Sequence, residues 1–136
     1  MTKEEDIQQK YMQFQMLQQQ MEEINQHLEM LNQNNAELEI SINAIRELGK
    51  TEPGNEVLAP IANGIFIKTK LEDNQKLIVN VGSDSTVEKT PEQVIRMLEE
   101  QVTQIHERMN EAEMVTQELN NQAMKIFQDV EENVNG

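Results

Sequence analysis

Apolar residues recur at alternating spacings of three and four over two long stretches of the chain. With residue 7 taken as heptad position a, the first stretch runs from Ile7 to Ile45, and the second runs from Ile95 to Asn133. Ten of the twelve a and d positions are apolar in each stretch. Heptads that continue this long without a skip are typical of coiled coils, so the pattern predicts two long amphipathic helices. The a and d positions of both stretches are called the seam below.

The ends of the predicted helices carry capping signals. Thr2 is followed three residues later by Glu5, as in a capping box, and Gly49 stands where a C′ glycine would close the first helix. The run Thr90-Pro91-Glu92-Gln93 supplies an N-cap threonine, a proline at N1 and a glutamine at N3. The sequence therefore predicts helices over residues 2–49 and 91–135, with residues 50–90 between them, in a single domain of residues 1–136.

Two helices of equal length joined by a short middle segment favour an antiparallel hairpin within one chain. If the numbers of facing residues sum to 140, every a position meets a d position, as in Leu31/Met109 and Leu17/Ala123. Small residues then face large ones, as close packing requires. A parallel dimer of two chains is the competing interpretation, because heptads alone do not fix the orientation of the helices.

Residues 57–89 change from heptads to short alternating runs. Asn63-Gly64 is a hairpin turn signal between 57–61 and 65–71, and a second pair of runs covers 76–82 and 85–89. Four short apolar strands cannot bury both faces alone and leave their edges unpaired, so we expect them to assemble with other subunits. A monomer whose sheet caps the coiled coil is the alternative. The expected oligomerisation residues are Val57, Leu58, Ile61, Ile65, Phe66, Ile67, Leu71, Leu77, Ile78, Val79, Val81 and Val87.

Composition and charge agree with this architecture and exclude several partners. Only 37% of residues are hydrophobic and 3% aromatic, which suits a narrow buried stripe and not a thick core. Of the net charge of −14, residues 2–48 carry −6 and residues 91–136 carry −7. Such acidic helices disfavour nucleic acid and anionic membranes as partners. No apolar run approaches the length of about 18 residues that a membrane span needs, and the cysteine-free chain without signal-peptide features fits a cytoplasmic protein.

The sequence offers no candidate for catalysis or for cofactor or metal binding. It contains no phosphate-binding glycine loop, metal-ligand spacing or nucleophile motif. His27 and His106 flank the seam and are interpreted as solvated surface, and Asn35 at an a position is interpreted as a polar layer that fixes the register. We therefore expect that the protein is not an enzyme and has no catalytic, cofactor or metal residues.

At this point the chain resembles a known family, the α class of prefoldin subunits of the archaeal type, over essentially its whole length. The most specific segment is 57–64, an apolar-proline-apolar run followed by small residues and glycine. Residues 77–82 and 87–90 also match, and two hairpins in place of one distinguish the α class from the β class. Ser83-Asp84-Ser85 departs from the expected glycine-rich segment, which leaves the turn of the second hairpin open.

The resemblance implies a fold and a function. The fold is mainly α with a small β module: a long antiparallel coiled-coil hairpin joined by two β-hairpins that assemble into an inter-subunit β-barrel. Two α and four β-class subunits would form a hexamer that captures unfolded proteins at the coiled-coil tips without ATP and delivers them to a group II chaperonin. The alternative function is a structural scaffold or spacer without client binding.

Apolar residues that the seam does not explain cluster near the N-terminus of the first helix and the C-terminus of the second. Exposed apolar residues gathered at one level indicate a binding surface, and methionine adapts to varied partners. Acidic residues in the last turns of the second helix also oppose its macrodipole, so we expect fraying there. Methionines elsewhere, such as Met30, Met97 and Met114, support the alternative that these residues are scattered by chance. Ile7 and Val130 belong to the seam, but their layers are weak because they lie next to Asn133 and Lys10, so we expect these layers to open and join the surface. With the seam residue Phe14 included, the predicted client-binding residues are Ile7, Tyr11, Met12, Phe14, Met16, Met124, Phe127 and Val130.

Overall fold

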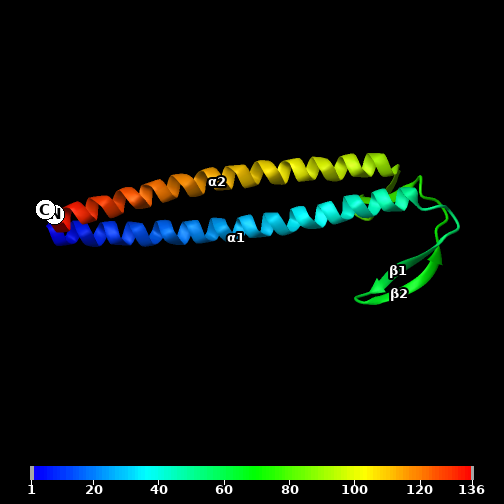
Figure 1. The fold of residues 1–136 in the computed structure, drawn as a ribbon, viewed down its shortest axis with the longest axis horizontal. Coiled ribbons are helices and arrows are strands. Elements are labelled where there is room, and N and C mark those ends of the chain that lie inside the picture. The colour runs from blue at the N-terminus through cyan, green and yellow to red at the C-terminus, as the bar shows by residue number, and fades with distance from the viewer. Residues whose placement is uncertain (1, 136) are drawn as a thin grey trace. The chain divides into compact units, whose positions relative to one another are not determined.

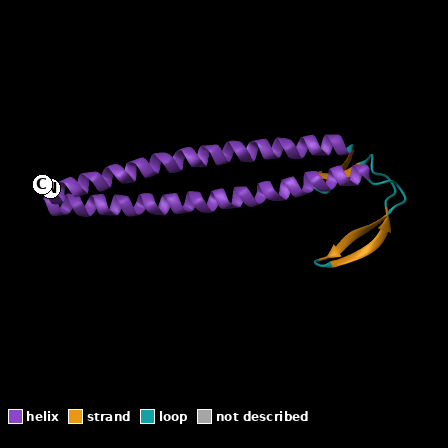
Figure 2. Cartoon of the chain, viewed as in Figure 1, coloured by secondary structure: helices purple, strands orange, loops and turns teal. Residues whose placement is uncertain are grey.

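The computed structural model of the protein describes residues 2–135 and contains two long helices and two β-hairpins (Figure 1). Figure 2 shows the change from helix to strand and back. The elements in chain order are α1 (Lys3–Lys50), β1 (Glu56–Ala62), β2 (Ile65–Lys70), β3 (Leu77–Gly82), β4 (Ser85–Lys89) and α2 (Pro91–Asn135). The predicted fold class, two coiled-coil helices with a small β module, is confirmed.

The chain divides into two compact units, which are described separately. The terminal unit is the chain up to Asn35 together with the chain from Gln104 onward, and the strand unit is Ala36–Thr103. In the terminal unit, the N-terminal part of α1 runs antiparallel beside the C-terminal part of α2 (Figure 1). The strand unit holds the other ends of both helices and all four strands. The two helices therefore pack as a hairpin within one chain, as predicted, and not as a parallel pair.

The seam is the core of both helix pairs. Each of its 24 positions is buried or half-buried, whereas nearly every other helical residue is exposed. Leu31, Ile105 and Ala123 are buried in the terminal unit, and Ile42 is buried in the strand unit. Phe14 shares a groove with Ile126, and Ile45 shares another with Ile95, so both units have pairs that agree with the predicted sum of 140.

Both helices begin with the predicted N-cap threonine, and α2 has the full capping box. The Glu5 backbone N–H donates to Thr2 Oγ1 at 3.2 Å. At the start of α2, the Gln93 N–H donates to Thr90 Oγ1 at 3.2 Å, and the Thr90 N–H donates back to Gln93 Oε1 at 3.0 Å. The second pair of bonds is a reciprocal capping box, which satisfies two donors that the helix itself leaves without acceptors.

The predicted C-terminal cap of α1 is wrong. Gly49 lies inside the helix, which ends at Lys50, and its φ is not positive as a C′ glycine requires. Asn74, from the link between β2 and β3, closes the helix instead. Its Nδ2 lies 2.6 Å from Thr51 O and 3.3 Å from both Leu48 O and Gly49 O. Because Asn74 is only 5% exposed, these bonds are shielded from water.

Each hairpin forms its own antiparallel two-stranded sheet within the described residues. In the first, Val57 pairs with Thr69, and in the second, Val79 pairs with Val87. Leu71, expected at the end of a strand, follows β2, and its N–H donates to Asn55 O at 2.9 Å. The turn that the sequence left open places Ser83 and Asp84 at φ of 51° and 59°, so both central residues have the positive φ of a type I′ turn.

Candidate functional site

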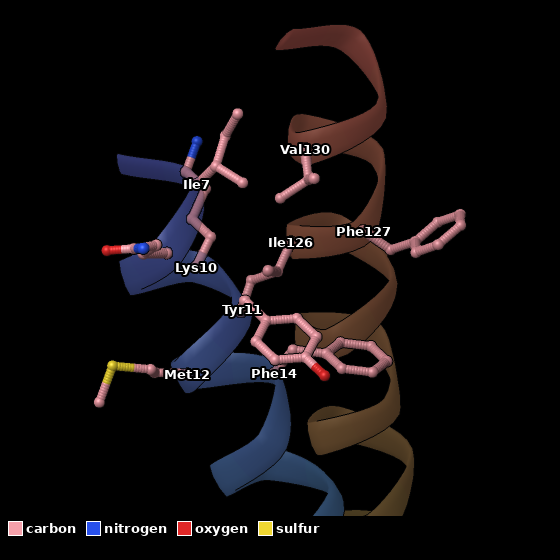
Figure 3. Close-up of a pocket in the computed structure, with 9 residues that line it drawn as sticks. Ile7, Lys10, Tyr11, Met12, Phe14, Ile126, Phe127 and Val130 are labelled. Carbon is pink, nitrogen blue, oxygen red and sulfur yellow. The ribbon is translucent and has the colours of Figure 1, made fainter. Parts of the chain in front are cut away.

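A groove of about 550 Å³ opens between the first turns of α1 and the last turns of α2, inside the terminal unit. Figure 3 shows Ile7 and Val130 turned toward the space between the helices, with Tyr11 and Phe14 beside Ile126. Its wall is almost entirely apolar. The lining residues are Ile7, Gln8, Lys10, Tyr11, Met12, Phe14, Ile126, Phe127 and Val130. This is called the apolar groove below.

The groove lies where the seam loses its regular apolar filling. Lys10 occupies a d position, at the level of Val130, where the other layers of α1 mostly carry a branched apolar side chain. Its ammonium pairs with Asp6 on the same helix, with Nζ and Oδ2 3.3 Å apart. A lysine held to its own helix cannot fill the layer as a leucine would. The two helices therefore leave an apolar hollow there in place of a packed layer.

The rim of the groove exposes large aromatic and thioether side chains to water. Tyr11 is 61% exposed and Phe127 is 60% exposed. In Figure 3, Met12 extends outward from α1 and Phe127 extends outward from α2, on opposite sides of the groove. An occupant that extends beyond the groove on either side can therefore contact one of these side chains. Burying one such side chain is worth about 1.5–3 kcal/mol, so the rim can supply substantial binding free energy without any chemical step.

Two smaller hollows adjoin the same turns of the helices. One, of about 420 Å³, is lined by Met124 and by Phe14 and Phe127, which also line the apolar groove. The other, of about 210 Å³, is lined by Met16 together with Leu17 and Ile126. Methionine side chains thus lie beside the aromatic ones in a continuous set of neighbouring hollows, which suits a surface that adapts to varied shapes.

The structure brings the eight residues of the predicted client-binding set into these three hollows. Six of them line the apolar groove, while Met124 and Met16 line one neighbouring hollow each. Sequence reasoning missed Ile126, which it assigned to the seam alone, and Lys10, whose presence at a d position was the available signal. Met30 and Met114, which lie outside the three hollows, are exposed, and Met97 is half-buried in the strand unit.

The second exposed apolar surface lies on the two hairpins. Leu58 and Phe66 are exposed on the first hairpin, and Ile78 is 75% exposed on the second. The opposite face of each hairpin is also apolar, with Val57 in β1 and Val79 in β3 half-buried and their face neighbours Ile67 and Val87 exposed. Of the twelve predicted oligomerisation residues, the exposed ones are Leu58, Ile61, Ile65, Phe66, Ile67, Ile78, Val81 and Val87, and the half-buried ones are Val57, Leu71, Leu77 and Val79.

The described residues offer neither a metal-binding cluster nor a membrane-spanning helix. Within residues 2–135, no three acidic or histidine side chains are grouped so that they could hold a metal ion. Over the same residues, neither helix has a stretch that is apolar enough to cross a membrane.

Comparison with known proteins gives consistent matches. The family model described as Prefoldin subunit matches residues 3–136. Prefoldin subunit alpha of Pyrococcus horikoshii is 30% identical over 120 residues, which cover 88% of this chain and 81% of the relative. Prefoldin subunit alpha of Methanoculleus marisnigri is 29% identical over 113 residues, which cover 83% and 75%. The cryo-EM structure of filamentous PFD from Methanocaldococcus jannaschii has a TM-score of 0.76 at 20% identity, covering 84% of this chain and 94% of that one, a likeness of fold.

Proposed function

Because the chain belongs to the prefoldin subunit family, a chaperone family, as an α-class subunit of the archaeal type, we propose that it is an ATP-independent holdase subunit. In this proposal it captures unfolded proteins at the ends of its coiled coil and passes them to a group II chaperonin. Its activity is binding and release, with no catalysed reaction. The cytoplasmic location inferred from the sequence belongs to the same proposal.

The observation that carries the proposal is the apolar groove with its exposed rim. A chain with 3% aromatic residues has only four of them, and three lie at this groove: Tyr11, Phe14 and Phe127. Large apolar side chains in water favour association with another apolar surface, and a groove of about 550 Å³ has the size of pockets that enclose a drug-sized ligand. The apolar groove is therefore large enough to bind a few apolar side chains of an unfolded segment.

The proposal also includes a hexamer of two α and four β-class prefoldin subunits, joined by strands in a shared β-barrel. Support comes from the hairpins, whose apolar side chains remain exposed and whose sheets have only two strands each within the described residues. An isolated two-stranded hairpin is marginally stable in water, and each of its outer edges offers unpaired N–H and C=O groups. Pairing with strands of other subunits would stabilise the hairpins and would also give their edge N–H and C=O groups hydrogen-bond partners.

The test is a variant in which Tyr11, Met12, Met16, Met124 and Phe127 are all changed to serine. We expect the variant to assemble as before, because none of the five lies in the seam or in the strands. We expect it to lose suppression of the aggregation of a chemically denatured test protein. Light scattering of the test protein measures that activity, and native mass spectrometry of the chain with its β-class partner measures assembly.

A matched control carries Met30→Ser and Met114→Ser, because these side chains are equally exposed but lie outside the three hollows. The control should suppress aggregation as the unaltered chain does. If the five-serine variant retained full activity, the groove would not be the capture site. If the unaltered assembly suppressed no aggregation at all, the chain would instead be a structural scaffold or spacer.

A further inference from the structure

The charge around the apolar groove is uneven between the two helices. The last turns of α2 carry Asp129, Glu131 and Glu132, and no lysine or arginine follows Lys125. The carbonyl end of the helix dipole adds negative potential at the same place. On α1, by contrast, the acidic first turn lies at the positive end of the dipole, and Asp6 is paired with Lys10. The negative potential is therefore concentrated on the α2 side of the groove.

Glu131 and Phe127 form a specific pair on that side. They lie four residues apart on α2, which places them on the same face, and both line the hollow that adjoins the apolar groove. The ion pairs found within residues 2–135 do not include Glu131. A cation placed between a carboxylate and an exposed aromatic ring is attracted by the charge of the carboxylate and by the negative face of the ring.

From this arrangement we propose that the preferred occupant is an unfolded segment in which lysine or arginine directly flanks large apolar residues. The apolar side chains fill the groove, and the basic side chain lies against Phe127 and Glu131. This inference rests on the proposed function, because it names the class of segment that the same groove binds. Acidic segments with the same apolar residues bind more weakly, because the three carboxylates of the last turns repel them.

The test measures binding of short fluorescent peptides to the full chain in the assembly in which it is isolated. The peptides share one apolar core and differ only in flanking residues, which are lysine, serine or glutamate. Fluorescence anisotropy should give a Kd about tenfold lower for the lysine peptide than for the glutamate peptide, with serine between them, since several exposed charge pairs each contribute modestly. Raising the salt from about 0.15 M to about 1 M shortens the Debye length from about 8 Å to about 3 Å and should remove most of this difference.

One variant and its matched control test where the basic side chain of the peptide binds. Glu131→Gln should reduce the advantage of the lysine peptide about threefold while leaving the serine peptide unchanged, because the hollow keeps its shape but loses the charge. Glu118→Gln is the matched control, since Glu118 is an exposed acid of α2 that lines none of the three hollows, and it should keep the full advantage.

The possible outcomes separate this inference from the function on which it rests. Equal affinity for the lysine and glutamate peptides would overturn the inference and leave client capture intact. Equal effects of Glu131→Gln and Glu118→Gln would overturn the placement of the cation beside Phe127. If none of the three peptides bound, capture at this groove would itself be wrong.

Discussion

The terminal unit and the strand unit both expose large apolar side chains, but their backbones differ. In the terminal unit the exposed residues stand on helices, whose N–H and C=O groups bond within the same helix. In the strand unit Ile40 also stands on a helix, but the others stand on two-stranded hairpins, whose outer edges pair with no further strand within the described residues. In the proposed function, a partner of the hairpins would therefore supply strands in a definite register, whereas an occupant of the groove would need no definite backbone register.

In the proposed function, this difference separates a permanent interface on the hairpins from a variable one at the apolar groove. Strand pairing is directional and specifies one neighbour, which suits assembly of defined subunits. Burial of apolar side chains is non-directional, and the methionines beside the groove can adjust to different occupants. The charges follow the same division: residues 49–90 carry a net charge of only −1, while the helical flanks carry −6 and −7 and disfavour acidic partners.

The largest expected effect comes from placing charge on the hairpin surfaces. Phe66→Asp combined with Ile78→Asp should abolish assembly, because Phe66 is 56% exposed in the single chain and would have to bury a carboxylate in the proposed interface. The circular dichroism spectrum should remain largely helical, because α1 and α2 pack along a seam that does not include these strands. Native mass spectrometry with a β-class subunit checks the loss.

Thr86→Asp provides the control for this variant. Thr86 is exposed on β4 opposite Asn80, so it places the same charge on a polar part of the second hairpin. We expect this variant to assemble with at most a small loss of affinity. If Phe66→Asp with Ile78→Asp assembled as well as Thr86→Asp, the exposed hairpin faces would not be the interface, and the contrast between the two units would fail.

The sequence was sufficient to predict the parts that repeat. The heptads predicted each seam position that the structure buries or half-buries. In a coiled coil, residues at alternating spacings of three and four face the other helix. Phe14 lines a groove with Ile126 and Ile45 lines another with Ile95, as expected for the predicted antiparallel register. Local signals also predicted the hairpins and the capping box at Thr90, since a few neighbouring residues determine each of them.

The sequence was insufficient where one residue acts on a distant segment. The side-chain amide of Asn74 bonds to Thr51 O, 23 residues earlier in the chain, and so caps the end of α1. Nothing in the polar sequence around Asn74 indicates which helix end this amide will reach. Gly49 was wrongly assigned that role because its local position fits a C′ glycine. The apolar groove likewise depends on Lys10 bonding to Asp6, so its size follows from packing and not from the list of exposed apolar residues.

An intermediate effect should follow from removing the cap that Asn74 supplies in the strand unit. Asn74→Asp keeps the shape of the side chain but replaces the donor Nδ2 with an acceptor facing the carbonyls of Leu48, Gly49 and Thr51. Leaving buried polar groups unsatisfied costs about 1–3 kcal/mol, so we expect the free energy of unfolding to fall by that amount. Urea denaturation followed by circular dichroism measures it.

Lys76→Ala is the control for the loss at Asn74, because Lys76 is exposed in the same link between β2 and β3. Its effect should stay within about 0.5 kcal/mol, as for most exposed positions. A decrease no larger than this for Asn74→Asp would mean that water caps the last turn of α1 equally well.

The smallest effect should be a gain of stability when the polar layer of the terminal unit is replaced by an apolar one. Asn35 stands at an a position, and its Oδ1 is buried without a hydrogen-bond partner within the described residues. Asn35→Leu removes that unsatisfied acceptor and adds apolar contact near Ile105, which the register places in the same layer. We expect the free energy of unfolding to rise by about 1 kcal/mol, measured by thermal unfolding. Gln33→Leu, at the outward position f, should leave it unchanged.

The same substitution tests what the polar layer contributes besides stability. A buried asparagine at an a position lowers stability but disfavours alternative registers, so the leucine variant should tolerate a shifted pairing of the helices. Leu17→Cys with Ala123→Cys reports the native register, because these positions face each other when the facing numbers sum to 140. The yield of this intrachain disulfide should be lower with Asn35→Leu than with Asn35 retained. An unchanged yield would mean that the caps and the matched layers of small and large residues fix the register without Asn35.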